Sequence, residues 1–180
     1  FNKAKEALQA QGVQFPIHLD MPVDQTAKTK VARAQSLKQS VEEILGKENV
    51  VVDLNQMSQD DLLNATLSAP NAAAEDWDIT DSVAWAPDYE DPSTYLDIFK
   101  TTASENTKTY MGFDNPNNAA AAQVGLKDFD ALVDNAAKET SNLNVRYERY
   151  AEAQAWLEDS SLFMPLMVNK GAAPMVARLT

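Results

Sequence analysis

The sequence contains no cysteine and a single histidine, His18. Without thiols the chain cannot form a disulfide framework, a thiolate zinc site or a cysteine nucleophile. One histidine also argues against a histidine-rich metal site and a Ser-His-Asp triad. No apolar run approaches the length of about eighteen residues that a membrane-spanning helix needs, so the sequence predicts none.

Positive charge is also scarce, with 15 lysine and arginine residues against 27 aspartate and glutamate residues. The resulting formal net charge of -12 argues against nucleic acid as a partner and against binding to an anionic membrane surface. Glycine is rare, and the stretches GKENVVV and VGLKDF lack the spacings of phosphate-binding loops. The run DNPNN lacks the glycine and the terminal glutamate of a calcium loop. We therefore expect no metal and no cofactor.

The 180 residues suffice for one domain with a sizeable core, and 44% of them are hydrophobic. We see no internal repeat and no linker, so we treat residues 1–180 as a single domain. The chain opens with FNKAKEALQAQG, without an initiator methionine, and we expect it to be an excised part of a larger protein.

Helices and strands alternate along the predicted chain, which favours an α/β or mixed α+β fold with parallel crossovers. Helix caps, glycine stops and apolar spacing predict the helices, and period-two or continuous apolar runs predict the strands. The predicted helices are 2–11, a long helix capped by Asp24 or Thr26 and ending at Leu45, 58–67, one starting at Asp91, 128–138 and 142–159. The predicted strands are 15–21, 49–57, 76–80, 82–86 and 161–168, and 101–127 is predicted to be an irregular excursion.

Apolar positions at helical spacing predict which helix faces are buried. In the long helix they are Val31, Ala34, Leu37, Val41 and Leu45. In the last helix they are Leu143, Tyr147, Tyr150, Ala151 and Leu157, and after Asp91 they are Tyr95, Leu96 and Phe99. His18 falls on the polar face of the first strand, where a solvated histidine is the plainest interpretation.

The stretch AWAPDYEDPSTYL, residues 84–96, holds the candidate site. Asp91 and Pro92 form a helix start. Asp88 follows Pro87 in a loop beyond a strand, where ligands gather in α/β layers. A carboxylate between Trp85 and Tyr89 would be partly desolvated and would pair well with an ammonium group. From these residues alone, a simple turn remains the alternative, and the nearby acids Glu75, Asp76 and Asp78 are as well explained as solvated loop residues and caps.

This stretch resembles the signature loop of oligopeptide-binding proteins, the large solute-binding components of ABC peptide importers. Other motifs of that family follow in order along most of the chain. They are the opening AKEALQAQGVQFPIHLDMP, Asn106 with Tyr110, Phe129-Asp130 with Leu132 and Ala136-Ala137, Arg146-Tyr147 to Leu157, and Met164-Pro165-Leu166. The long spacing from Gly112 to Lys127 is similar to that of the lipid-anchored members from Gram-positive cocci.

The resemblance implies the C-terminal lobe of a two-lobed, periplasmic-binding-protein-like fold, with a central mixed sheet flanked by helices. It implies that Asp88 pairs with the α-amino group of a peptide, and that Trp85 and Tyr89 shape the adjacent side-chain pocket. Val83-Ala84 and Leu166-Met167-Val168 depart from the family pattern, which affects the pocket rather than the amine site.

We therefore expect a non-enzymatic, monomeric receptor that delivers peptides to ABC importer permease subunits. The resemblance places it on the extracellular face of the membrane, held by a lipid anchor outside this chain. Three alternatives remain open: a receptor for a signalling peptide or another solute, a carboxylate-based hydrolase, and an adhesion or interaction module.

Overall fold

The computed structural model describes residues 1–81, 88–103 and 119–163. These residues form a mixed α/β structure, which confirms the predicted fold class. The strands are β1 (Ile17–Asp24) and β2 (Val50–Met57). The helices are α1 (Asn2–Ala10), α2 (Lys28–Leu45), α3 (Gln59–Ala65), α4 (Ser93–Leu96), α6 (Ala119–Gln123), α7 (Leu126–Ala137) and α8 (Leu143–Asp159), with 3₁₀ turns η1 (Ala72–Ala74) and η2 (Asp97–Phe99).

The two strands are parallel and are joined by α2, the crossover that the sequence predicts. Their register pairs Ile17 with Val50 and Asp24 with Met57. Gly46 ends α2 as expected, with φ of 82°, and its N–H donates to the carbonyl of Glu42. Within the described residues the sheet has only these two strands, so the broader mixed sheet stays a prediction.

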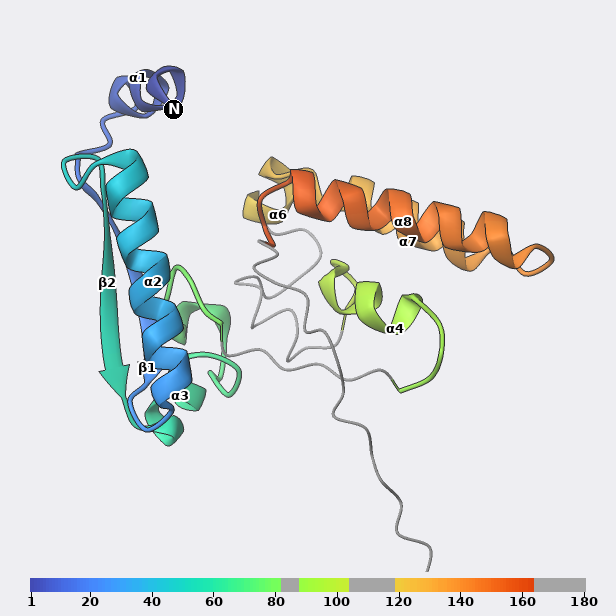
Figure 1. Ribbon diagram of the computed structural model, residues 1–180. Coiled ribbons are helices and arrows are strands. Elements are labelled where there is room, and N and C mark those ends of the chain that lie inside the picture. The colour runs from blue at the N-terminus through green and yellow to red at the C-terminus, as the bar shows by residue number, and fades with distance from the viewer. Residues whose placement is uncertain (82–87, 104–118, 164–180) are drawn as a thin grey trace, which may run out of the picture.

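One hydrophobic cluster lies between α2 and the sheet (Figure 1). Its buried members are Met21, Val23, Ala34 and Val52, and the predicted helix residues Val31, Leu37 and Val41 pack against them. Leu45 is only half-buried and lies outside the cluster. The strand β1 starts two residues later than predicted, and Met21 to Asp24 are all buried, so the period-two pattern holds only in its first half. His18 is exposed, as predicted.

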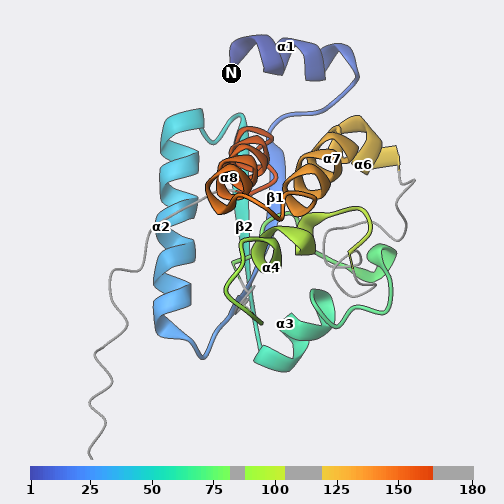
Figure 2. The same ribbon diagram turned by 90° about the vertical axis from the view of Figure 1, so that its right-hand side faces the viewer.

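A second cluster lies between α7 and α8, which run side by side with α4 next to them (Figures 1 and 2). Its buried members are Leu96, Ala121, Leu126, Phe129, Val133, Ala136, Tyr150, Ala153 and Leu157. Phe129 packs against Trp156 with ring centroids 5.7 Å apart. The two clusters share no residue among those described.

The predicted stripe of α8 is correct at Tyr150 and Leu157 but wrong at Leu143, Tyr147 and Ala151, which are exposed. The inward face instead carries Tyr150, Ala153 and Leu157, one face at i, i+3 and i+7. Tyr95 is exposed as well, contrary to prediction, because Leu96 is the residue of α4 that enters the core.

Helix starts were predicted correctly where a side-chain cap forms. Ser58 Oγ accepts from the N–H of Asp61, and Asn142 Oδ1 accepts from the N–H groups of Asn144 and Val145. The start of α2 was predicted wrongly. Its N-cap is Ala27, and Asp24 instead accepts from the N–H and hydroxyl of Thr26 in a local turn. This bonding lowers the pKa of Asp24.

Residues 76–80 are not a strand, which corrects the prediction. The N–H groups of Asp78 and Ile79 both donate to the carbonyl of Asp20, and the N–H of Asp20 donates to Asp78 Oδ2. The Asp78 carboxylate therefore accepts the N–H of Asp20, which in a sheet would donate to a backbone carbonyl of a neighbouring strand.

Three other predicted segments are only partly described. Residues 82–86 lie outside the described residues, and of 161–168 only 161–163 are described, where Leu162 and Phe163 are exposed. The end of the predicted excursion 101–127 is helical rather than irregular, because α6 and the first residues of α7 fall in it. None of the described helices has the length and apolar character needed to cross a bilayer.

Candidate functional site

The loop that holds Asp88 and Tyr89 leads directly into α4. Asp88, Tyr89 and Glu90 are all exposed. The backbone N–H of Asp88 donates to Thr94 Oγ1 at 3.2 Å, and the Tyr89 hydroxyl lies 3.3 Å from Ser93 Oγ. The loop is thus fastened to the first turn of α4 by the backbone of Asp88 and the side chain of Tyr89, and the Asp88 side chain lies at the surface.

Asp91 begins the turn that leads into α4, as predicted. Its Oδ1 accepts from the N–H of Ser93 at 3.0 Å, and its carbonyl accepts from the N–H of Thr94 at 3.2 Å. Pro92 has the helical φ of -59° that such a start requires. The helix start is confirmed, but Asp91 does more than cap, because its carboxylate also pairs with an arginine.

Arg146, in the first turn of α8, binds the Asp91 carboxylate through two parallel hydrogen bonds. Nε donates to Oδ2 at 2.9 Å, and Nη2 donates to Oδ1 at 3.0 Å. The Arg146 and Asp91 side chains are only 15% and 20% exposed. Such a bidentate pair fixes both the distance and the plane of the two groups. Asp91 is therefore a partly buried, paired acid as well as part of the helix start.

The rest of the Arg146 guanidinium binds α7 and α8. Nη1 donates to the carbonyl oxygens of Ala136, Ala137 and Glu139 at 3.1, 2.9 and 3.1 Å. Nη2 also donates to the Tyr150 hydroxyl at 3.0 Å. These carbonyls end α7, where a cation is favoured by the helix dipole. One side chain thus joins the α4 loop, the end of α7 and α8.

These contacts shift the pKa values of the groups involved. The hydrogen bonds from Arg146 lower the pKa of Asp91 to about 2, from an ordinary value of 3.8. The same bonds to Asp91 raise the pKa of Arg146. Burial raises the pKa of the Tyr150 hydroxyl, so it remains neutral. At neutral pH the pair is therefore fully ionised.

The segment after α4 is tied to α7 as well. The N–H of the buried Thr101 donates to Asp130 Oδ1 at 2.9 Å, and its hydroxyl donates to Oδ2. One turn further along α7, Lys100 Nζ lies 2.5 Å from Asp134 Oδ1. Residues 88–103 are thus held to the α7–α8 pair at both ends.

Sequence reasoning singled out Asp88 and Asp91 but assigned no role to Arg146. An arginine four residues before a buried tyrosine was the available signal, because buried arginines require partners. Trp85, Asn106, Tyr110 and 164–166 lie outside the described residues. The contact between Trp85 and Asp88 therefore stays a prediction.

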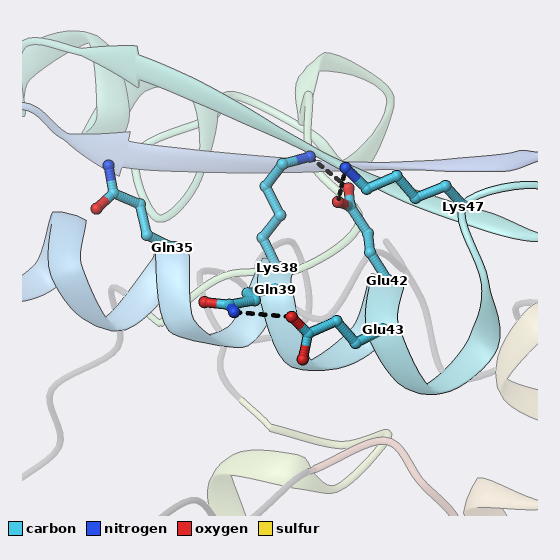
Figure 3. A pocket seen from close by; sticks show the side chains of 6 residues that line it. All are labelled: Gln35, Lys38, Gln39, Glu42, Glu43 and Lys47. Carbon is cyan, nitrogen blue, oxygen red and sulfur yellow. Dashed lines mark hydrogen bonds and ion pairs between the residues drawn. The ribbon is translucent and has the colours of Figure 1, made fainter.

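A depression of about 320 Å³ lies along α2, on a side of the helix that borders β2 (Figure 3). Inside it, Lys38 Nζ and Lys47 Nζ both contact the Glu42 carboxylate, the latter at 3.4 Å. Glu42 Oε1 also accepts from the N–H of Val52 at 3.2 Å, and Lys38 donates to the Val52 carbonyl. The depression is lined by Gln35, Lys38, Gln39, Glu42, Glu43 and Lys47.

The polar groups of this depression satisfy one another rather than face a ligand. Glu42 is 4% exposed, and the hydrogen bond from Lys38 lowers its pKa. Over the described residues no group of three acids or histidines could hold a metal ion. His18 Nδ1 lies 2.6 Å from Asp53 Oδ2 on the exposed polar face of the sheet. The Asp88 loop is therefore the better candidate.

Solved structures identify the fold class. The chain is similar to the substrate-binding domain of an oligopeptide ABC transporter from Bacillus anthracis, with a TM-score of 0.57 and 22% identity over 88% of this chain and 26% of that chain. It is equally similar to the murein tripeptide binding protein MppA of Escherichia coli, with a TM-score of 0.57 and 21% identity over 89% and 27%. The fold is that of part of a peptide-binding protein.

Sequence relatives are much more similar. The chain is 65% identical over 179 residues to the oligopeptide-binding protein AmiA of Streptococcus pneumoniae, covering 99% of this chain and 27% of that protein. It is 63% identical over 171 residues to the oligopeptide-binding protein SarA of Streptococcus gordonii, covering 95% and 26%. No protein-family model matches the sequence.

These relatives confirm the resemblance to the oligopeptide-binding proteins. The chain spans about a quarter of the length of the curated relatives that it matches. The relatives are named as binding proteins rather than as enzymes.

Proposed function

We propose that this chain is the C-terminal lobe of an extracellular oligopeptide receptor that delivers peptides to an ABC importer. The observation that carries the proposal is its 65% identity to an oligopeptide-binding protein along 99% of its length. The proposal covers residues 1–180 as one lobe, with the second wall of the binding cleft supplied by another part of the protein.

Asp88 is the proposed binding residue for the peptide amino terminus. It is exposed, and its backbone N–H rather than its carboxylate is bonded to Thr94, so its carboxylate is available to a ligand. A receptor for many peptides must bind what all peptides share, and the terminal ammonium is the one charged group among these features that a carboxylate binds directly. Tyr89, 56% exposed, and Trp85 are proposed to shape the adjacent pocket.

The test uses the full-length protein that carries this chain and a pool of synthetic hexapeptides, free or N-acetylated at the amino terminus. We expect Asp88→Asn to weaken binding of the free pool about tenfold or more, because a charge-assisted bond is lost. Binding of the acetylated pool should not change. Titration calorimetry with each pool measures both affinities.

Glu90→Gln is the matched control, because it removes one negative charge from the same exposed loop. It should leave both affinities nearly unchanged. Equal binding of the two pools by the unaltered protein, or an unchanged preference in Asp88→Asn, would contradict the amine site. Binding of neither pool, with a copurified non-peptide solute found by mass spectrometry, would instead support the alternative of another solute.

The remaining proposals concern the whole protein. We infer that it is a monomer, that it docks on permease subunits, and that it is held at the outer membrane face by a lipid anchor outside this chain. The lipid anchor is tested by the incorporation of radiolabelled palmitate into the full-length protein. Its location is tested by treating intact cells with protease and measuring whether the protein is released from their surface. Binding without catalysis predicts that the peptide pool is recovered uncleaved after long incubation.

A further inference from the structure

We propose that Arg146 is a positioning residue for the amine-binding carboxylate of Asp88. This inference rests on the proposed function, because it assigns the residue that sets the geometry of the same site. Among the described residues, Arg146 on α8 binds Asp91, the end of α7 and Tyr150 rather than Asp88 itself. It acts through Asp91 and the first turn of α4.

The first step of the connection runs from Arg146 to the loop. The guanidinium holds both oxygens of Asp91, at 2.9 and 3.0 Å, which fixes the orientation of that carboxylate. The oriented Oδ1 then accepts from the N–H of Ser93, and the Asp91 carbonyl accepts from the N–H of Thr94. The position of residues 93 and 94 therefore follows from the position of the guanidinium.

The second step runs from α4 to Asp88. Thr94 is 5% exposed, and its hydroxyl accepts from the backbone N–H of Asp88 at 3.2 Å. Because this bond holds the backbone of Asp88, a shift of the α4 turn moves the Cα from which its carboxylate projects. A charge-assisted bond to an ammonium group requires a heavy-atom distance of about 2.7–2.9 Å, so a displacement of 1 Å is enough to lose it.

Arginine suits this role because it has five donors in a rigid planar fork. Arg146 uses the fork to bind Asp91 on one side, and the carbonyls of Ala136, Ala137 and Glu139 lie on the other. Its ring contact with Tyr150, at 4.9 Å from the centroid, holds the guanidinium plane. Lysine has a single ammonium and could not bind both sides in one geometry.

The experiment measures the amine preference, defined as the Kd of the N-acetylated hexapeptide pool divided by the Kd of the free pool, in the full-length protein. We expect Arg146→Gln and Asp91→Asn each to reduce this ratio several-fold. The affinities are measured below the temperature at which either variant unfolds. Asn at position 91 retains an oxygen for the N–H of Ser93, so this second variant keeps the helix cap if Arg146→Gln fails to fold. The double variant Asp88→Asn/Arg146→Gln should have the same ratio as Asp88→Asn alone, because the two residues act in series.

Arg149→Gln is the matched control. Arg149 lies on the same helix and also reaches α7, donating to the Asn135 carbonyl at 3.2 Å. Its other contact among the described residues is with Glu139 rather than with residues 88–94. This variant should have the same amine preference as the unaltered protein. If Arg146→Gln and Asp91→Asn also keep that preference unchanged, the positioning role is overturned while the amine site remains intact. Absence of any preference in the unaltered protein would overturn both proposals.

Discussion

Arg146 and Asp91 lie 55 residues apart in the sequence and are joined by two hydrogen bonds of 2.9 and 3.0 Å. This pair connects the first turn of α8 to the loop that carries the candidate binding residues. Its two side chains are largely buried, so solvent screens it less than a surface ion pair.

Asp91→Asn should lower the free energy of unfolding at neutral pH by about 1–2 kcal/mol, which is less than the full pKa shift implies because solvent still reaches part of the carboxylate. The loss corresponds to a fall in Tm of about 2–8 °C for a chain of this size. Because the folded pKa of Asp91 is about 2 and its ordinary value is 3.8, the stabilisation is complete above about pH 4. It should vanish as the pH falls toward 2, so the Tm difference between protein and variant should shrink over this range. Thermal unfolding followed by circular dichroism from pH 7 to pH 2 measures this difference in Tm, and Glu90→Gln is the control. A difference in Tm that does not depend on pH would contradict the stabilising role of the ionised Asp91.

Glu42→Gln should lower Tm, because the neutral amide no longer pairs with Lys38 and Lys47 and the side chain at position 42 is only 4% exposed. We expect a fall of roughly 3–6 °C in a thermal melt at pH 7. Glu43→Gln is the matched control on the adjacent, exposed position, where the carboxylate contacts only Gln39 among the described residues (Figure 3). Equal effects of the two substitutions would show that the buried position of Glu42 does not matter.

Val133→Ala should reduce the free energy of unfolding by about 2 kcal/mol, because two methyl groups leave a site that is 0% exposed. Val124→Ala makes the same chemical change at a position that is 44% exposed and should stay within about 0.5 kcal/mol of the unaltered protein. Urea unfolding of both variants gives the two values. A similar loss in both would mean that the α7–α8 cluster is not the core that the packing indicates.

Asn142→Ala should cost about 1 kcal/mol, because Oδ1 of Asn142 accepts from the N–H groups of Asn144 and Val145 at the start of α8. Asn144→Ala is the control two residues away, inside the helix and exposed, where alanine has the better helix propensity. That variant should be unchanged or slightly more stable in the same urea titration. A cost at position 144 but none at position 142 would contradict the cap.

Local chemistry explains which parts of the fold were predictable. The cap at Ser58 and the stop at Gly46 depend on neighbouring residues only, and both were identified from the sequence. The start of a helix at Asn142 was also predicted, although its side-chain cap was not. The apolar stripe of α2 was also predictable, because Ala34 and its neighbours face a sheet from a single side. The helix start at Asp91 was predictable for the same reason, because Asp91 Oδ1 accepts from the N–H of the nearby Ser93.

Competing partners, some local and some distant in the sequence, explain what was missed. Thr26 and Asp24 both have the chemistry of a cap, yet they bond to each other, and α2 begins without a side-chain cap. The segment 76–80 has strand composition, but the Asp78 carboxylate takes the N–H of Asp20, 58 residues away. Arg146 could not be assigned to Asp91 because nothing in the spacing shows which acid α8 will meet.

Both outer edges of the β1–β2 pair are occupied by the chain's own groups at mid-strand. On one edge, Asp78 and Ile79 bind the N–H and carbonyl of Asp20. On the other edge, Glu42 and Lys38 bind the N–H and carbonyl of Val52. A foreign strand could add at these positions only by displacing a carboxylate that is already bonded. These two positions are therefore protected against edge-to-edge aggregation.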